Sequence, residues 1–278
     1  MRTTISDWEL LITGCGTSHG NPPWGYPQLW SEDPRDLRRR AGAVLFGPTG
    51  QVLLIDAGLD LQHQMRDSDR TWDGRSYPKK CVVRCDAVLL THDHADHSHG
   101  LNDLRHLNRL MGGASIRIYG AREHLDAVQT MFPYCFGEPD RLYQLGSPSL
   151  AAVAMHDGER TEVAGLPVVA FPMSHGPAGR TTGFRCGGMA WLTDLKVLPA
   201  EADAHLSGLD LLVLDMLRDQ EHSTHLNWSE AQAIIARLKP RRTVLIHMGY
   251  EVKYGEWQPR LPANVTMAYD GYRCRFTA

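Results

Sequence analysis

Three histidines and two aspartates are packed into the seven residues Thr91–His97. They follow directly on the apolar run Ala87–Leu90, which predicts a buried strand that ends in a His-x-His-x-Asp-His loop. Imidazole and carboxylate groups together suit zinc, manganese or iron. A chance surface cluster and a purification tag are the alternatives, but a tag would be terminal and uninterrupted, and catalytic metal sites are built from such clusters. The loop therefore predicts a catalytic metal site.

Length and composition favour one globular unit. The chain has 278 residues, of which 42% are hydrophobic, enough for a substantial core. No linker or low-complexity stretch divides it, so we expect a single domain over residues 1–278. A formal net charge of −3 indicates no strong preference for nucleic acid or anionic membrane. The basic run from Arg35 to Arg40 is expected to be a solvated face, with a phosphate-facing role as the alternative.

Targeting signals are not evident in the sequence. No apolar segment approaches the roughly 20 residues that span a bilayer. Met1–Asp7 lacks the basic and apolar regions of a signal peptide. The six cysteines show no paired framework, which favours reduced thiols. We therefore expect a cytoplasmic protein without a membrane partner.

Apolar runs and turn residues predict strands and helices in both halves of the chain. Helices are expected over Leu101–Leu110, over Ala121–Phe132 and from a cap at Asn227 to about Lys239. The pattern indicates sheets covered by helices, an α/β layered fold. The expected strands are Trp8–Thr13, Ala43–Phe46, Val52–Ile55, Ala87–Leu90, Ile116–Tyr119, Leu166–Phe171, Thr181–Cys186, Met189–Thr193, Leu211–Asp215, Thr243–Ile246 and Val265–Tyr269.

Further candidate ligands stand at the ends of expected strands, where the ligand sites of layered α/β folds concentrate. Each alone is more often an ordinary polar residue or a helix cap. Together, in the order His, Asp, His after the histidine loop, they favour one shared metal centre. They are His175 after Leu166–Phe171, Asp194 after Met189–Thr193 and His247 after Val244–Ile246.

These motifs, with Ile55–Gly58 before the histidine loop, resemble those of the metallo-β-lactamase-fold hydrolase superfamily. The resemblance extends from Gly14 to Asp270 and implies a four-layer αββα sandwich. It also implies two divalent metal ions, zinc or manganese, in a cleft. By this resemblance one metal is held by His92, His94 and His175, the other by Asp96, His97 and His247, and Asp194 bridges the two.

Within the superfamily, Gly14–Pro22 and Asp33–Arg35 resemble the phosphodiesterase branch associated with the carbon–phosphorus lyase pathway. His225 matches a histidine that this branch has before a late helix and that tRNase Z enzymes have near the metals. True β-lactamases match less well, because their third metal-binding motif differs. The phosphodiesterase branch builds a structural zinc site from a cysteine cluster, but Trp24–Trp30 contains no cysteine. A structural metal is therefore not expected.

The resemblance implies hydrolysis of a small phosphodiester, cyclic esters included. Two cations about 3.5–4 Å apart would activate a shared water and stabilise charge on the phosphoryl group. Asp96 is expected to bind a metal and orient that water. His225 is the first candidate for the general acid and His222 the second, with a surface histidine as the alternative for each.

Other residues have weaker assignments. Asp56 is expected to hydrogen-bond a metal ligand or a backbone amide, with a turn cap as the alternative. Ser18 and His19 are candidates for lining the substrate pocket, although a simple turn explains them equally well. The polar insertion Leu61–Arg84 is expected to be a loop with one helix, with a lid or a dimer contact as alternatives.

Three other functions stay open. A tRNase Z-like endoribonuclease would need a Gly- and Lys-rich arm that is not evident here, so nucleic acid is not the favoured partner. A lactonase or thioesterase would use the same activated water. A non-catalytic metal-binding protein would be similar to family members linked to pyrroloquinoline quinone formation. Seven intact ligands and His225 favour catalysis on a small molecule, and a homodimer stays open as the commonest oligomer.

Overall fold

Two seven-stranded sheets form the centre of the structure, a computed structural model that describes residues 8–67, 82 and 84–277. The first sheet has the order β14 (Arg273–Phe276), β1 (Trp8–Gly14), β2 (Gly42–Phe46), β3 (Val52–Ile55), β4 (Ala87–Leu89), β5 (Ile116–Gly120) and β6 (Leu150–Ala154). The second has the order β13 (Val265–Met267), β12 (Arg242–Ile246), β11 (Leu211–Asp215), β10 (Met189–Leu192), β9 (Arg180–Cys186), β8 (Leu166–Ser174) and β7 (Arg160–Val163).

Each sheet is mixed, with an antiparallel part and a parallel part. In the first sheet β14, β1, β2 and β3 pair antiparallel, and β3 to β6 pair parallel. In the second, β7 to β10 pair antiparallel and β10 to β13 pair parallel. Parallel neighbours end at the same edge of their sheet, so residues that follow them come together there.

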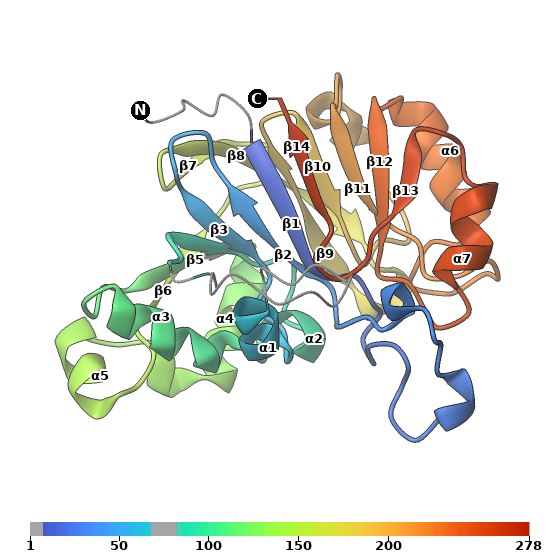
Figure 1. Cartoon of the computed structure of the whole chain (residues 1–278). Coiled ribbons are helices and arrows are strands. Elements are labelled where there is room, and N and C mark those ends of the chain that lie inside the picture. The colour runs from blue at the N-terminus through green and yellow to red at the C-terminus, as the bar shows by residue number, and fades with distance from the viewer. Residues whose placement is uncertain (1–7, 68–81, 83, 278) are drawn as a thin grey trace, which may run out of the picture.

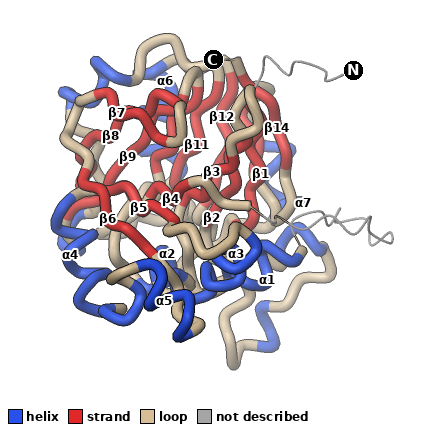
Figure 2. The backbone as a smooth tube through the Cα atoms, turned by 90° about the vertical axis from the view of Figure 1, so that its left-hand side faces the viewer, coloured by secondary structure: helices blue, strands red, loops and turns tan. Residues whose placement is uncertain are grey.

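The two faces of the first sheet contribute to different cores. Along β1, Leu10 and Ile12 belong to the core shared with the second sheet, whereas Leu11 belongs to the core beneath the helices of the N-terminal half. Burial on both faces explains why these strands are continuous apolar runs without polar alternation. Figure 2 shows the strands of both sheets in the middle of the molecule with helices around them.

The helices cover the sheets. Helices α1 to α5 gather beside the first sheet, and α6 and α7 lie beside the second (Figure 1). None of the helices in the described part of the chain combines the length and the hydropathy that crossing a membrane requires. The α-helices are α1 (Leu61–Arg66), α2 (Ala95–Ser98), α3 (Arg105–Leu110), α4 (Arg122–Met131), α5 (Pro139–Leu145), α6 (Trp228–Leu238) and α7 (Tyr254–Trp257). The 3-10 helices are η1 (Pro27–Leu29), η2 (Pro34–Asp36), η3 (Leu101–Leu104), η4 (Pro133–Cys135), η5 (Gly176–Ala178), η6 (Ala200–His205) and η7 (Gln258–Arg260).

This architecture confirms the expected layered α/β fold, and all eleven expected strands are present with ends shifted by at most three residues. The cap at Asn227 is confirmed. Its side chain accepts from the backbone amide of Glu230, and the Glu230 side chain accepts from the backbone amide of Asn227. The helix expected over Leu101–Leu110 is instead divided into η3 and α3. Strands β6, β7 and β14 and helices α2, α5 and α7 were not predicted, and α1 was expected only as the one helix of the insertion Leu61–Arg84.

The basic run differs from the solvated face that we expected. Arg38 is buried, and its guanidinium lies 2.8 Å from the carboxylate of Asp36. Arg35, Arg39 and Arg40 also each lie within 3.1 Å of an aspartate oxygen. Because none of the four lines the pocket described below, the alternative of a phosphate-facing run is not supported either. Of the insertion Leu61–Arg84, most lies outside the described residues, and its first part forms α1.

Candidate metal centre

The candidate ligands all follow strands that end at one edge of the two sheets. The histidine loop follows β4, and His175 follows the long strand β8. Asp194 lies just beyond β10, and His247 directly follows β12. Asp194 and His247 have φ angles of 54° and 59°, a left-handed conformation in which the backbone turns sharply at the end of its strand.

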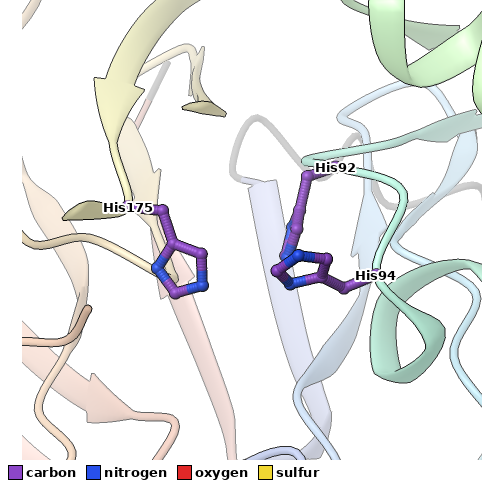
Figure 3. Close-up of side chains that lie close together, drawn as sticks. All are labelled: His92, His94 and His175. Atoms are coloured by element: carbon purple, nitrogen blue, oxygen red, sulfur yellow. The ribbon is translucent and has the colours of Figure 1, made fainter. Parts of the chain in front are cut away.

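Two groups of side chains converge there. The three-histidine group consists of His92, His94 and His175, whose candidate ligand atoms lie within 4.8 Å of one another. Figure 3 shows His175 facing His92 and His94 from the opposite side of the site. The mixed group, which meets the same 4.8 Å limit, consists of Asp96, His97, Asp194 and His247. The structure thus brings all seven sequence-predicted ligands together.

Asp194 lies between the two groups. Its Oδ1 is 3.7 Å from Nε2 of His175 and 4.0 Å from Nε2 of His92, both in the three-histidine group. The same oxygen is 3.3 Å from Nε2 of His247, and Oδ2 is 3.1 Å from Nε2 of His97. One carboxylate therefore faces imidazoles of both groups, which is the placement expected of a bridging ligand.

The inward nitrogens fit metal ligation, because on His92 and His97 the protein satisfies only the outward nitrogen. The Thr91 hydroxyl donates to Asp56, so it accepts from Nδ1 of His92 at 3.0 Å. Nδ1 of His97 donates to Asp56 at 2.7 Å. By contrast, Nε2 of His92, His97 and His247 is buried and has no hydrogen-bond partner within the described residues. Buried polar atoms without partners are costly, and a divalent ion would satisfy these.

The charges in the mixed group also fit cations. Burial alone would raise the pKa of Asp194, but the neighbouring His247 and His97 outweigh burial and lower that pKa well below its usual value. The pKa of Asp96 is lowered in the same way, burial being outweighed chiefly by His97. Both carboxylates are therefore ionised and suited to a divalent ion.

Asp56 supports the histidine loop. It follows β3 with a φ of 63°, and its side chain is fully buried. Besides His97, it accepts from the backbone amide of Thr91 at 2.8 Å. The sequence predicts a hydrogen bond from Asp56 to a metal ligand or to a backbone amide, and the structure contains one of each kind.

Asp215 is a further candidate site residue, which sequence reasoning missed. It ends β11 and is fully buried, and Oδ2 accepts from Nδ1 of His225 at 2.9 Å and from the amide of Leu195 at 3.0 Å. A signal was available, because Asp215 follows the apolar run Leu211–Leu214 as Asp194 and His247 follow theirs. We had assigned it only to the end of a core strand.

Of the two candidate acids, His225 lies closer to the metal ligands. Its ring centre is 4.6 Å from that of His247 and 4.8 Å from that of His175, and its side chain is mostly buried. His222 lies 5.4 Å from His225 and is half-buried. Burial and then His225 lower the pKa of His222.

The centre opens into a pocket of about 730 Å³. Both Ser18 and His19 line it, as do His222 and His225. Arg218, which the sequence analysis did not single out, lines it too. The pocket size lies within the range of small-molecule sites.

Similarity to known proteins agrees with this geometry. A diphosphatase of the PhnP family is 29% identical, and the match covers 97% of each chain with a TM-score of 0.82. Zinc-bound PqqB from Methylobacterium extorquens is 18% identical over 96% of this chain and 99% of its own, with a TM-score of 0.70. The short form of human tRNase Z is 18% identical over 96% and 98%, with a TM-score of 0.63. The last two share the fold.

A curated relative, an octanoyltransferase from Porphyromonas gingivalis, is 29% identical over 267 residues, or 95% of this chain. The chain spans about half the length of that relative. The family model of the β-lactamase superfamily domain matches residues 51–248, which include the histidine loop, His175, Asp194 and His247. The chain therefore belongs to the β-lactamase superfamily, and it has the metallo-β-lactamase fold of metal-dependent hydrolases.

Proposed function

We propose that this protein is a binuclear metal-dependent phosphodiesterase that hydrolyses a small phosphodiester, cyclic esters included. The observation that carries the proposal is the position of His225. Asp215 orients its ring, and the ring lies beside His175 and His247 at the wall of the pocket. A histidine so placed is suited to protonate an alkoxide leaving group as it departs from a phosphoryl centre.

Different residues of the chain would bind the metals, orient the attacking water and protonate the leaving group. Metal ions bound by the three-histidine group and the mixed group, zinc or manganese, would supply an activated water and electrostatic stabilisation of the phosphoryl oxygens. Asp96 lies in the pocket wall, where its carboxylate can bind a metal and orient the attacking water. His225 holds the proton for the leaving group at Nε2, because Nδ1 is engaged by Asp215.

The similarity to a diphosphatase supports phosphoryl chemistry, because that relative covers nearly the whole chain. We do not propose acyl transfer from the similarity to the octanoyltransferase, because the chain spans only about half of that protein. We propose a small molecule as the partner, because the pocket has the size of a small-ligand site.

A substrate panel tests the proposal. Protein stripped with chelator and reloaded with zinc or manganese is expected to turn over bis(p-nitrophenyl) phosphate in preference to a lactone and a precursor tRNA. Turnover of the lactone alone, or of the tRNA alone, would contradict it.

A leaving-group comparison tests His225. His225→Ala is expected to lower kcat by about 10²–10⁴ for an ester with an alkoxide leaving group, because that group needs the proton. The loss should be much smaller with p-nitrophenolate, which departs without protonation. His63→Ala, an exposed histidine on α1, is the control and should behave like the parent. Equal losses on both esters would remove His225 from the acid role.

A further inference from the structure

The pocket offers more room than the reacting group needs. Its volume of about 730 Å³ exceeds what a single phosphoryl group fills, so other parts of the substrate contact its walls. Among the described residues that line it, Arg218 is the only lysine or arginine. It follows Asp215 by three positions, and Asp215 orients His225. The cation therefore belongs to the segment that also positions the candidate acid.

The hydrogen-bonding capacity of Arg218 is largely unused. Nη2 donates to the carbonyl oxygen of Glu221 at 3.2 Å. Nε is buried and has no hydrogen-bond partner within the part of the chain that the structure describes. Glu251, which also lines the pocket, lies 3.8 Å away from Nη1, too far for a hydrogen bond. A guanidinium has five N–H donors in a planar fork, and the one hydrogen bond to Glu221 engages only one of them.

The arginines of the basic run differ from Arg218 in this respect. Arg35 lies 2.6 Å from Asp33, Arg38 lies 2.8 Å from Asp36 and Arg40 lies 3.1 Å from Asp60. Each of these guanidiniums is bound to a carboxylate of the protein and serves the fold. Among the arginines that the structure describes, Arg218 alone combines a place in the pocket with a loose carboxylate contact.

We infer that Arg218 binds a second anionic group of the substrate, a phosphate or a carboxylate, next to the phosphoryl group that is hydrolysed. This inference rests on the proposed phosphodiesterase function and narrows its substrate class. Planar N–H pairs match the oxygens of both anions, which is why arginine is preferred for such recognition. Glu251 serves as the counter-charge while the pocket holds no substrate.

The neighbourhood of His222 agrees with this placement. Its pKa is lowered, first by burial, then by His225 and then by the charge of Arg218. The positive field of Arg218 therefore reaches the wall of the pocket that carries the candidate acid.

Three p-nitrophenyl esters with one common leaving group provide the test. They are the esters of methyl phosphate, of phosphoglycolate, which adds a carboxylate, and of methyl diphosphate, which adds a phosphate. The metal-loaded parent should prefer at least one of the doubly charged esters over the methyl phosphate ester by about 10- to 100-fold in kcat/KM. The preferred ester identifies the anion. Arg218→Gln should remove most of this preference, chiefly through KM, and Arg218→Lys should restore part of it.

The matched control is Arg237→Gln. Arg237 likewise donates to a backbone carbonyl, that of Leu198, and lies 3.2 Å from a carboxylate, that of Asp203, but outside the pocket lining. The Arg237→Gln variant should keep the preference for the doubly charged esters. Should Arg218→Gln fail to fold, Glu251→Gln gives an independent test, because removing the counter-charge should raise kcat/KM for the charged esters by about 2- to 5-fold.

The outcomes separate two failures. No turnover of any of the three esters would refute the proposed function itself. Turnover without a preference for a second charge, or equal losses on all three esters in Arg218→Gln, would leave the phosphodiesterase standing and overturn the role of Arg218.

Discussion

The three-histidine group and the mixed group face each other across Asp194, but they differ in charge. Burial lowers the pKa of His92 well below its usual value, and burial also lowers the pKa of His175. In the mixed group the histidine pKa values are raised instead of lowered. Burial alone would lower the pKa of His247, but Asp194 and the other carboxylates raise it to about 9. The pKa of His97 is raised for the same reason.

This difference determines what each group must do to receive a cation. Metal binding requires a neutral imidazole. Two rings of the three-histidine group, those of His92 and His175, are already neutral. The mixed group holds ionised carboxylates against protonated rings and must release protons. Two neighbouring sites of one centre are therefore expected to fill under different conditions.

The largest expected effect comes from removing what the groups share. Asp194→Ala should lower kcat by about 10⁴ or more, because both metals and the activated water depend on this carboxylate. Metal analysis should show less than two ions per chain. An Asp194→Ala protein with full metal content and activity near that of the parent would show that Asp194 does not bridge the groups.

The pH dependence of metal affinity should separate the groups. Below about pH 9 the ring of His247 carries a proton that the metal must displace, and the pKa of His97 is raised as well, so affinity at the mixed group should rise by about tenfold or more per pH unit between pH 7 and 9. Affinity at the three-histidine group should stay nearly constant over that range. Zinc titrations at several pH values, with proton release measured by calorimetry in different buffers, would check this. Parallel slopes for both metals would abolish the distinction.

A smaller effect is expected from Asp56→Asn, which acts on one group. Asp56 binds His97 directly, so the variant should weaken metal binding at the mixed group by about 10- to 100-fold. The three-histidine group should lose less, because Asp56 reaches His92 only through Thr91. Metal competition assays with one and two equivalents of zinc would measure both sites. Equal weakening would mean that Asp56 supports the whole loop.

Sequence reasoning succeeded where the signal was local. Four of the seven candidate ligands come from one loop after β4, so their proximity follows from the chain itself. His175, Asp194 and His247 could be selected only because each ends an apolar run and because the order matched a known superfamily. Their meeting depends on the way the second sheet aligns the ends of β8, β10 and β12, which no single segment encodes.

The missed elements have physical reasons as well. β6 has the sequence LAAVA, in which alanine gives a weak strand signal. β7 is polar because it lies at a sheet edge, and β14 alternates arginine with apolar residues over only four positions. Arg218 could not be found because nothing in its local sequence distinguishes a pocket-facing arginine from a paired one. That difference depends on distances to Glu251 and Glu221, which only folding sets.

The positive φ angles of Asp56, Asp194 and His247 have a consequence for the history of such a chain. Glycine is the residue that adopts this conformation most readily, yet these positions need side chains for chemistry. The less favourable backbone conformation is therefore retained for what the side chains do. In a descendant released from its catalytic duty, we expect Asp194 and His247 to be replaced before Asp56. Asp56 also accepts from the buried amide of Thr91, and losing that bond would cost stability whether or not the protein is active.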